Sequence, residues 1–458
     1  MRQSRWIALI LALALVAAAC GGDDSDGEGV GDEASAEDTT VEDTPAGDTT
    51  AETGDGSDEP TASATGVTED GIKLGFAYAD LEALAEQGFV DLDHGPYEDL
   101  MQVLVDDLNA NGGIDGRQVE VVYGGFLPVD TEEQLALCTR FTEDEEVFAV
   151  LGGLDGDSML CVTEQHETIA VGGTLTDELL ERSVAPWVTA NASVERTAAA
   201  LVELLDREGE LDGRTIAVHG SAGADSKVAS DVVAPTLEAA GYEVTYESVV
   251  DAPQNDPQAS SELVAINIEK MKEEGVDTVI AVGRSIPVAD FAEAGFFPHV
   301  YTTEIGPTRA LALGGQVDLG AFPTFATVGS DGPEVHAQNP ALQECIRIWE
   351  DATGEEILSL DEELAQGESS GRVGLRISCN VLRLFAAVAE AAGTDLNNES
   401  FLAGAESLGE ITLPAAEQAS FGPGKYDGQD AFTIFRWDTS VESDDKFVAD
   451  GDPEVLDG

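Results

Sequence analysis

The sequence predicts an α/β protein made of two doubly wound lobes, each with a parallel sheet. The chain has 458 residues, which is more than one hydrophobic core usually supports, and 43% of them are hydrophobic. Short apolar runs alternate with segments of helical periodicity, as in βαβ units. This alternation ends near residue 190 and begins again near 194, so we expect two such lobes in series.

The first run starts with a buried strand at 72–78, followed by a helix at 96–111. Gly112 and Gly113 end this helix, in keeping with glycine at helix C-termini. The pattern then predicts strands at 119–123, 147–151, 169–171 and 187–189 and a helix at 131–143.

The second run repeats the pattern. Its expected helices are 194–208, 226–240, 257–274 and 287–294, and its expected strands are 215–219, 242–250, 278–282 and 300–303. Beyond these we expect a strand at 325–328, helices at 340–352, 371–392 and 398–408, and a late strand at 431–437.

The charge of the chain excludes some functions. It carries 21 Lys and Arg against 91 Asp and Glu, a net charge of −70. Nucleic-acid binding needs a basic surface, and adhesion to anionic lipid by charge alone needs one too. Such acidity is typical of a solvated surface suited to a salty exterior.

The first twenty residues have the features of an export signal. Arg2 and Arg5 precede a short apolar stretch, 6–16, which is too short to span a membrane comfortably. The run LVAAAC at 15–20 resembles the bacterial lipobox, in which the cysteine is acylated and the chain is cut just before it. The resemblance implies a signal peptide over 1–20 and a lipid anchor at Cys20, on the extracytoplasmic face of the cell membrane. The alternative is an ordinary signal peptide with an incidental cysteine.

Residues 21–70 contain no Lys or Arg and few large apolar side chains. Such a segment cannot bury enough surface to offset the entropy of ordering. We therefore expect a disordered acidic tether.

Four cysteines remain: Cys138, Cys161, Cys345 and Cys379. An even number in an exported chain suggests two disulfides, with three possible pairings. We prefer Cys138–Cys161 and Cys345–Cys379, since each closes a short loop within one structural unit. Metal ligation would need a C-x-x-C pair or a nearby histidine, so we expect no metal.

A family resemblance appears at 109–122, NANGGIDGRQVEVV. This segment resembles the one after the first helix in type I periplasmic binding proteins of the branched-chain amino-acid receptor group. Weaker matches follow in the family's order at 147–152 (VFAVLG), 238–244 (EAAGYEV) and 421–428 (FGPGKYDG). The resemblance covers roughly residues 68–440.

The resemblance implies two lobes joined by a three-strand hinge, with crossings near Asn191, Leu319 and Lys425. Lobe 1 would combine 70–191 with 320–425, lobe 2 would combine 192–319 with 426–450, and 451–458 would be a tail. It also implies a monomer that captures a small-molecule solute and delivers it to an ABC-type permease. The alternative is a ligand-sensing ectodomain that acts through a separate membrane signalling partner.

Ligands of open α/β sheets bind beyond the carboxyl ends of the strands, where helix N-termini favour anions. The candidates at these ends are Tyr78, Asp80, Leu154, Asp155, Ser158, Gly173 and Thr174 in the first lobe, and Ser221, Asp225, Arg284, Ser285 and Glu304 in the second.

Several candidates have a structural alternative. Ser158 and Asp225 could cap helices, the pairs 152–153 and 172–173 could serve only tight turns, and Tyr78 could be core packing. Arg284 could pair with a ligand carboxylate or with a protein acid.

The resemblance suggests roles for two positions. It implies an acidic group near Glu304 for a ligand ammonium. It also implies an Ala-Thr pair after the fourth strand, but 172–176 reads GGTLT, so Thr174 or Thr176 could bind a carboxylate. The family's Tyr-Gly pair is replaced by AGADS at 222–226, which weakens the expectation of an amino-acid ligand.

Two other classes fit poorly. The sequence has no H-E-x-x-H, P-loop or G-x-G-x-x-G motif, and its five histidines (94, 166, 219, 299 and 336) show no metal spacing, so neither an enzyme nor a cofactor is expected. Nothing repeats internally, as an array-forming surface protein would require.

Overall fold

A computed structural model describes residues 60–81, 94–128, 130–154, 156–220, 227–250, 257–283, 286–304, 306–329, 338–366, 369–442 and 445–456. The expected signal peptide, Cys20 and most of the expected tether therefore lie outside the described residues. Within the described ranges, every helix is too short or too polar to span a bilayer.

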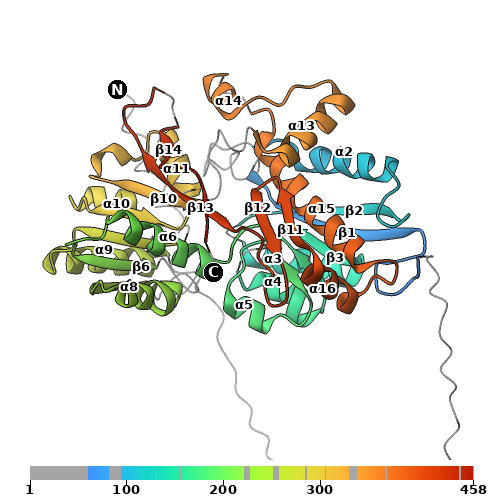
Figure 1. Ribbon diagram of the computed structural model, residues 1–458, viewed down its shortest axis with the longest axis horizontal. Coiled ribbons are helices and arrows are strands. Elements are labelled where there is room, and N and C mark those ends of the chain that lie inside the picture. The colour runs from blue at the N-terminus through green and yellow to red at the C-terminus, as the bar shows by residue number, and fades with distance from the viewer. Residues whose placement is uncertain are drawn as a thin grey trace, which may run out of the picture. The chain divides into compact units, whose positions relative to one another are not determined.

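The strands alternate with helices through most of the chain (Figure 1). The strands are β1 (Gly71–Ala79), β2 (Gln118–Phe126), β3 (Ala149–Gly152), β4 (Ile169–Val171), β5 (Trp187–Val188), β6 (Ile216–Gly220), β7 (Val244–Val249), β8 (Thr278–Val282), β9 (His299–Thr302), β10 (Phe325–Gly329), β11 (Gly409–Leu413), β12 (Ala416–Phe421), β13 (Ala431–Trp437), β14 (Phe447–Ala449) and β15 (Glu454–Val455).

The α-helices are α2 (Tyr97–Ala110), α3 (Thr131–Thr139), α4 (Ser158–Leu160), α5 (Asp177–Arg182), α6 (Val194–Glu208), α8 (Ala234–Ala240), α9 (Pro257–Glu273), α10 (Val288–Glu293), α11 (Gly306–Leu313), α13 (Pro340–Thr353), α14 (Leu360–Gln366), α15 (Arg372–Ala392) and α16 (Asn398–Ser407). Short π-helices η1 (Arg140–Asp144), η2 (Cys161–Gln165) and η3 (Ala229–Val233) and the 3₁₀ turn η4 (Leu319–Ala321) complete the set.

The first sheet has the strand order β2-β1-β3-β4-β5, and all its pairings are parallel. From β1 the chain moves first to one side, to β2, and then to the other, to β3. The loops after β1 and β3 therefore diverge, which creates a topological switch point between these two strands.

The second sheet has the order β14-β13-β10-β9-β8-β6-β7, with β15 paired to β13. Strands β6 to β10 are parallel, and β13 joins β10 in the antiparallel direction. Because β7 and β8 flank β6, this sheet has its own switch point between β6 and β8. Both sheets thus confirm the predicted doubly wound α/β architecture.

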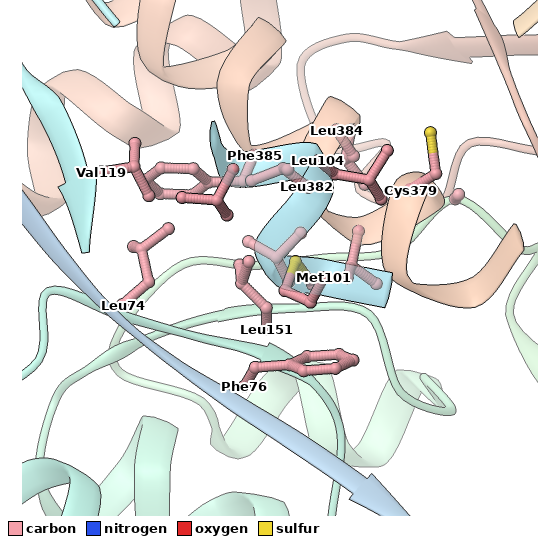
Figure 2. Packing of buried hydrophobic residues seen from close by; sticks show 14 of the residues in the cluster. Leu74, Phe76, Met101, Leu104, Val119, Leu151, Cys379, Leu382, Leu384 and Phe385 are labelled. Carbon is pink, nitrogen blue, oxygen red and sulfur yellow. The ribbon is translucent and has the colours of Figure 1, made fainter. Parts of the chain in front are cut away.

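Alternate side chains along the first sheet enter two cores, because successive strand residues point to opposite faces. Leu74, Phe76 and Leu151 belong to the core beneath α2, α13 and α15, whereas Ala77 and Val150 belong to the core on the other face. Figure 2 shows the first of these cores, with side chains of β1 and β3 facing those of α2 and α15.

The second sheet is covered in the same way. Val218 and Ile280 pack with apolar side chains of α6, η3 and α8, and Ala217 and Val279 pack with those of α9 and α10. Strands buried on both faces explain the continuous apolar runs that the sequence shows.

Strand β10 corrects the predicted lobe boundary. We expected a crossing near Leu319 and assigned 320–425 to lobe 1, but β10 pairs with β9 and β13 of the second sheet. Its apolar FATV run pairs with the edge of β9 that faces away from β8. The chain thus belongs to the second sheet as far as Gly329, and α13 packs on the first sheet; residues 330–337 lie outside the described residues.

Part of the segment that we predicted to be a disordered tether is folded. Residues 60–70, assigned to the tether, pack on lobe 1: Val67 is buried, and Ser63 Oγ donates to the carbonyl of Leu396 at 2.7 Å. The fully buried guanidinium of Arg117 donates to the carbonyls of Thr61 and Thr68, each at 3.0 Å. Arg117, the last residue of the GGIDGR segment, thus holds residues 61–68 against lobe 1.

Both preferred disulfides are present, Cys138–Cys161 and Cys345–Cys379. The first joins α3 to the beginning of η2, and the second joins α13 to α15. Each closes a loop of the length that we expected.

Candidate functional site

The carboxyl ends of the first sheet lie at one edge. The register pairs Ala77 with Gly152, Leu151 with Val171, and Val171 with Val188. The loops that follow β1, β3 and β4, which carry the predicted site residues of lobe 1, therefore begin side by side.

The glycines at this edge are required by close contact between strand ends. Gly152 has φ +91°, and a Cβ built there would lie 2.0 Å from the carbonyl oxygen of Ala77. Gly172 has φ +105°, and its Cβ would lie 2.4 Å from the oxygen of Gly152. Any side chain would push the strands apart, so these glycines permit the loops to converge.

Tyr78 is partly buried at the end of β1. Its hydroxyl donates to Glu98 Oε1 at 2.8 Å, and its ring stacks on Tyr97 with the centroids 5.1 Å apart. Burial, aided by the hydrogen bond to Glu98, raises the pKa of the Tyr78 hydroxyl above its ordinary value. The side chain is therefore a protonated group held against α2, and packing accounts for much of its position.

The other lobe 1 candidates divide into two groups. Leu154 is 3% exposed and belongs to the core on the α3 side, and Ser158 is buried in the first turn of α4, one residue past the N-cap position. Asp80 and Gly173 lie at the strand-end edge, where the Gly173 carbonyl accepts a hydrogen bond from Thr189 Oγ1 at 3.2 Å. Asp155 lies outside the described residues.

The structure distinguishes the two threonines that follow β4. Thr176 is buried and caps α5, because its Oγ1 accepts from the backbone N–H of Leu179 at 3.2 Å. Thr174 is exposed in the loop at the strand ends. The structure thus places Thr174 at the exposed strand-end edge and Thr176 at the buried N-terminus of α5.

In the second lobe, Ser221, Asp225, Arg284 and Ser285 lie outside the described residues. Glu304 is partly buried just beyond β9, and Thr302 Oγ1 accepts from its backbone N–H at 3.2 Å. The neighbouring Thr303 Oγ1 accepts from the N–H of Gly283 at 3.0 Å. This bond ties the ends of β8 and β9 together and holds Glu304 at the carboxyl edge of the sheet.

The structure adds a hollow of about 250 Å³ that the sequence reasoning missed. Residues of the β4–α5 connection meet residues of α6 and the start of η3 there. Its lining residues are Thr176, Asp177, Glu178, Glu195, Lys227, Val228, Asp231 and Val232. The available sequence signal was the set of acidic residues in the first turns of α5 and α6.

Glu195 connects the two sides of this hollow. Its Oε1 accepts from the backbone N–H of Asp177 at 3.1 Å, so a side chain on α6 binds the N-terminus of α5. Burial raises the pKa of the Glu195 carboxyl, and the charge of Asp177 adds to the rise while Lys227 opposes it. The first helix of lobe 2 is thus attached to the strand-end loop of lobe 1.

One group resembles a metal site: ligand atoms of Cys138, Cys161 and His166 lie within 4.8 Å of one another. The two sulfurs are joined in a disulfide and are not thiolates, and thiolates are what a metal would need. No other group of this kind occurs in the described part of the chain.

Comparisons with known proteins agree with this geometry. A family model described as periplasmic binding protein matches residues 88–442. A comparison with curated protein sequences finds no significant match.

Solved structures share the fold at low sequence identity. A leucine-binding protein from Thermotoga maritima has a TM-score of 0.58 at 11% identity, covering 83% of this chain and 98% of its own. A fatty acid ABC transporter substrate-binding protein from Thermomonospora curvata has a TM-score of 0.57 at 15% identity, covering 86% and 95%. A solute-binding protein from Rhodopseudomonas palustris BisB5, in complex with 3,4-dihydroxybenzoic acid, has a TM-score of 0.56 at 14% identity, covering 84% and 97%.

The family match covers well over half of the chain, and the two doubly wound sheets are those of the type I fold. The chain belongs to the periplasmic binding protein family.

Proposed function

We propose that this protein captures a small carboxylate-bearing solute outside the cytoplasm and delivers it to an ABC-type permease. The observation that carries the proposal is the strand-end edge of lobe 1 in a chain of this family. There Thr174 is exposed beside glycines whose backbone converges at a switch point. Hydroxyl and backbone N–H donors at such an edge suit a carboxylate.

The similar structures support this ligand class by analogy. One is described as a complex with leucine, one with 3,4-dihydroxybenzoic acid and one with benzoate, and all three ligands carry a carboxyl group. Their other portions differ widely. We therefore propose the carboxylate as the shared feature, with an amino acid or a related amide or carboxylate as the solute.

The test is a thermal-shift screen of the purified protein with amino acids, amides, aromatic acids and fatty acids. A ligand at 100 times its Kd stabilises the folded state by about 2.7 kcal/mol, which raises Tm by several degrees. A class that raises Tm identifies the solute chemistry. A screen in which no carboxylate in any class raises Tm contradicts the proposal.

Glu304 is proposed as the partner of a ligand ammonium, if the solute has one. Glu304→Gln should then weaken binding of that solute at least tenfold, and binding of its des-amino analogue should be unchanged. Glu293→Gln, an exposed carboxylate on α10 of the same lobe, is the matched control. Equal affinities of the Glu304 variant and the native protein would remove Glu304 from the site.

We also propose that Cys20 carries the lipid anchor and holds the protein at the extracytoplasmic face of the membrane. Mass spectrometry of the N-terminal peptide should find diacylglycerol on this cysteine, and Cys20→Ser should release the protein from the membrane fraction. Retention of the Cys20→Ser protein in the membrane fraction would contradict this anchor.

A further inference from the structure

Two segments that cross between the sheets lie side by side. The backbone N–H of Thr189 donates to the carbonyl of Tyr426 at 2.9 Å, and that of Gly428 donates back to Thr189 at 2.8 Å. A Cβ on Gly428 would meet the ring of Phe421 at 2.8 Å, so the approach is close. These segments, 189–193 and 425–430, form the described part of the connection between the lobes.

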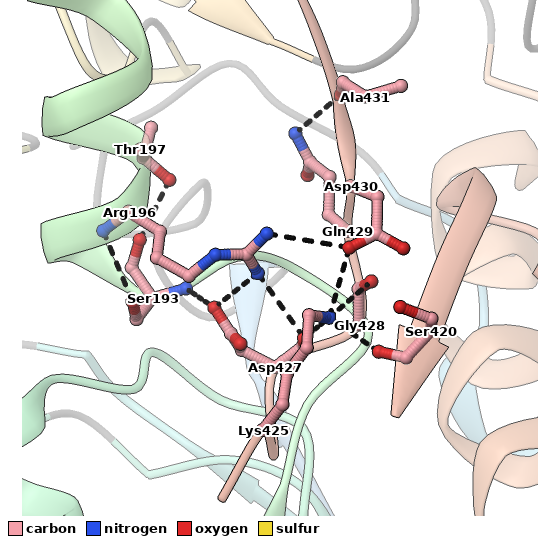
Figure 3. Close-up of polar contacts among 10 residues, drawn as sticks. All are labelled: Ser193, Arg196, Thr197, Ser420, Lys425, Asp427, Gly428, Gln429, Asp430 and Ala431. Atoms are coloured by element: carbon pink, nitrogen blue, oxygen red, sulfur yellow. Dashed lines mark hydrogen bonds and ion pairs between the residues drawn. The ribbon is translucent and has the colours of Figure 1, made fainter. Parts of the chain in front are cut away.

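Four charged side chains, which we call the crossing cluster, surround this connection: Arg196, Lys425, Asp427 and Asp430. Figure 3 shows Arg196 reaching from α6 toward the two aspartates. Its Nη1 lies 2.9 Å from Asp427 Oδ2 and its Nη2 lies 3.4 Å from Asp430 Oδ1. Lys425 Nζ lies 3.1 Å from the same Asp430 oxygen. Two positive and two negative charges therefore balance.

The cluster is sheltered from water. The side chains of Arg196 and Asp427 are 18% and 8% exposed. The chain has only 21 Lys and Arg against 91 acids, yet two of these cations lie here. A sheltered pair of opposite charges interacts more strongly, and in a more fixed direction, than the exposed pairs elsewhere on the surface.

Asp427 is the centre of the cluster. Its Oδ2 accepts from the backbone N–H of Ser193 at 2.7 Å as well as from Arg196. Ser193 is the N-cap of α6, so one carboxylate oxygen holds both the cap and the first turn of the first helix of lobe 2.

The other end of the cluster belongs to lobe 1. The carbonyl of Gly428 accepts from the N–H of Ser420, and the N–H of Asp430 donates to the carbonyl of Gln418, so 428–430 is bound to β12. The Asp427–Arg196 pair therefore joins α6 of lobe 2 to a segment bound to lobe 1. Any rotation of one lobe against the other must turn about this pair or break it.

We propose that Asp427 and Arg196 are the positioning pair about which the lobes turn, and that the pair sets the equilibrium between open and closed forms. The inference rests on the proposed capture of a solute between the lobes, and it assigns no ligand contact to either residue. Weakening the pair should change the populations of the open and closed forms even when no solute is present.

The test measures the distance between the lobes of the full-length, solute-free protein. Spin labels are attached through a ketone-bearing non-natural amino acid at Leu135 on α3 and Ile266 on α9, which are 41% and 56% exposed. This chemistry leaves the disulfides intact. Electron–electron double resonance then gives the distance distribution for the native protein, Asp427→Asn, Arg196→Gln and the double variant.

We expect each single variant to shift the ratio of interlobe states by about tenfold, which corresponds to about 1.4 kcal/mol. The distribution should broaden or gain a second peak, and the double variant should add little to either single one because the pair acts as a unit. Arg196→Lys, which keeps the charge, should lie between native and Arg196→Gln.

The matched control is Arg347→Gln with Asp351→Asn, an Arg–Asp pair with the same 2.9 Å separation but 61% and 70% exposed on α13. Its distance distribution should match the native one. If Asp427→Asn does not fold, Arg196→Lys and Asp430→Asn carry the test.

Lower Tm values with distance distributions that superimpose on the native one would show a merely structural pair and overturn the inference. Because no solute is present, that result would leave the proposed capture function standing. Conversely, a negative solute screen would leave the measured lobe distribution unaffected.

Discussion

His219 should make lobe 2 sensitive to acid. Its side chain is 1% exposed on β6, and its Nδ1 lies 2.8 Å from Ser248 Oγ on β7. Its Nε2 has no hydrogen-bond partner in the described part of the chain. Burial lowers the pKa of this imidazole to about 4, because a charged ring would lose its hydration.

The sign of the effect follows from proton binding. The unfolded chain protonates His219 near its ordinary pKa of about 6.5, whereas the folded chain resists protonation until about pH 4. The free energy of unfolding is therefore unaffected by His219 above about pH 6.5, and it decreases as pH falls from 6.5 toward 4. The loss is about 2 kcal/mol at pH 5, with a ceiling of about 3 kcal/mol at lower pH.

The assay compares the native protein with His219→Gln in urea at pH 7.5 and 5.0. The native protein should lose about 2 kcal/mol more free energy of unfolding between these pH values than the variant. Glu195 and Glu208, whose carboxyl pKa values are raised by partial desolvation, add to the stability of the folded state as pH falls. They are present in both proteins and cancel in the comparison.

The same replacement at His166, which is partly exposed, is the matched control. An NMR titration of the histidine Cε1–H signals reports on His219 directly, and its resonance should not move above pH 5. A resonance that titrates near 6.5, or equal losses in native and variant proteins, would refute the reasoning.

Three further predictions concern stability. Gly152→Ala should cost at least about 1 kcal/mol in urea unfolding, because φ +91° and the nearby Ala77 carbonyl exclude a Cβ; an unchanged midpoint would contradict the close contact. Arg117→Met should lower the free energy of unfolding by about 3 kcal/mol and expose residues 60–68 to limited proteolysis, since the guanidinium binds the carbonyls of Thr61 and Thr68. A native cleavage pattern would show that Arg117 does not hold that segment in place. Replacing Cys138 and Cys161 by serine should cost about 3–4 kcal/mol, as expected for their sequence separation of 23; equal stability of oxidised native protein and variant would exclude this contribution.

Local sequence patterns were enough to predict most elements of the fold. The continuous apolar runs at 74–77 and 278–282 mark strands buried on both faces, and such strands occur where helices cover a parallel sheet. The strand ends then locate the loops that include Thr174 and Glu304. Short sequence separation also favoured both disulfide pairings, which the structure contains.

Other features depend on contacts between distant segments. Thr174 and Thr176 are equivalent in the sequence, and only the structure shows that Thr176 is the buried N-cap of α5 while Thr174 is exposed. Leu154 follows a strand as a ligand contact would, but it turns into the core. Neither outcome has a local signal, because each depends on where α4 and α5 begin and on what they pack against.

The sequence by itself determined the two doubly wound sheets and the glycine-rich strand ends, because hydrophobic period and turn chemistry are local properties of the chain. Only the tertiary structure decided that β10 belongs to the second sheet and that residues 60–70 pack on the first lobe. It also decided that Asp427 faces Arg196, 231 positions away in the chain. Hydrogen bonds and charge pairs over such separations depend on the path of the whole backbone, which no window of sequence contains.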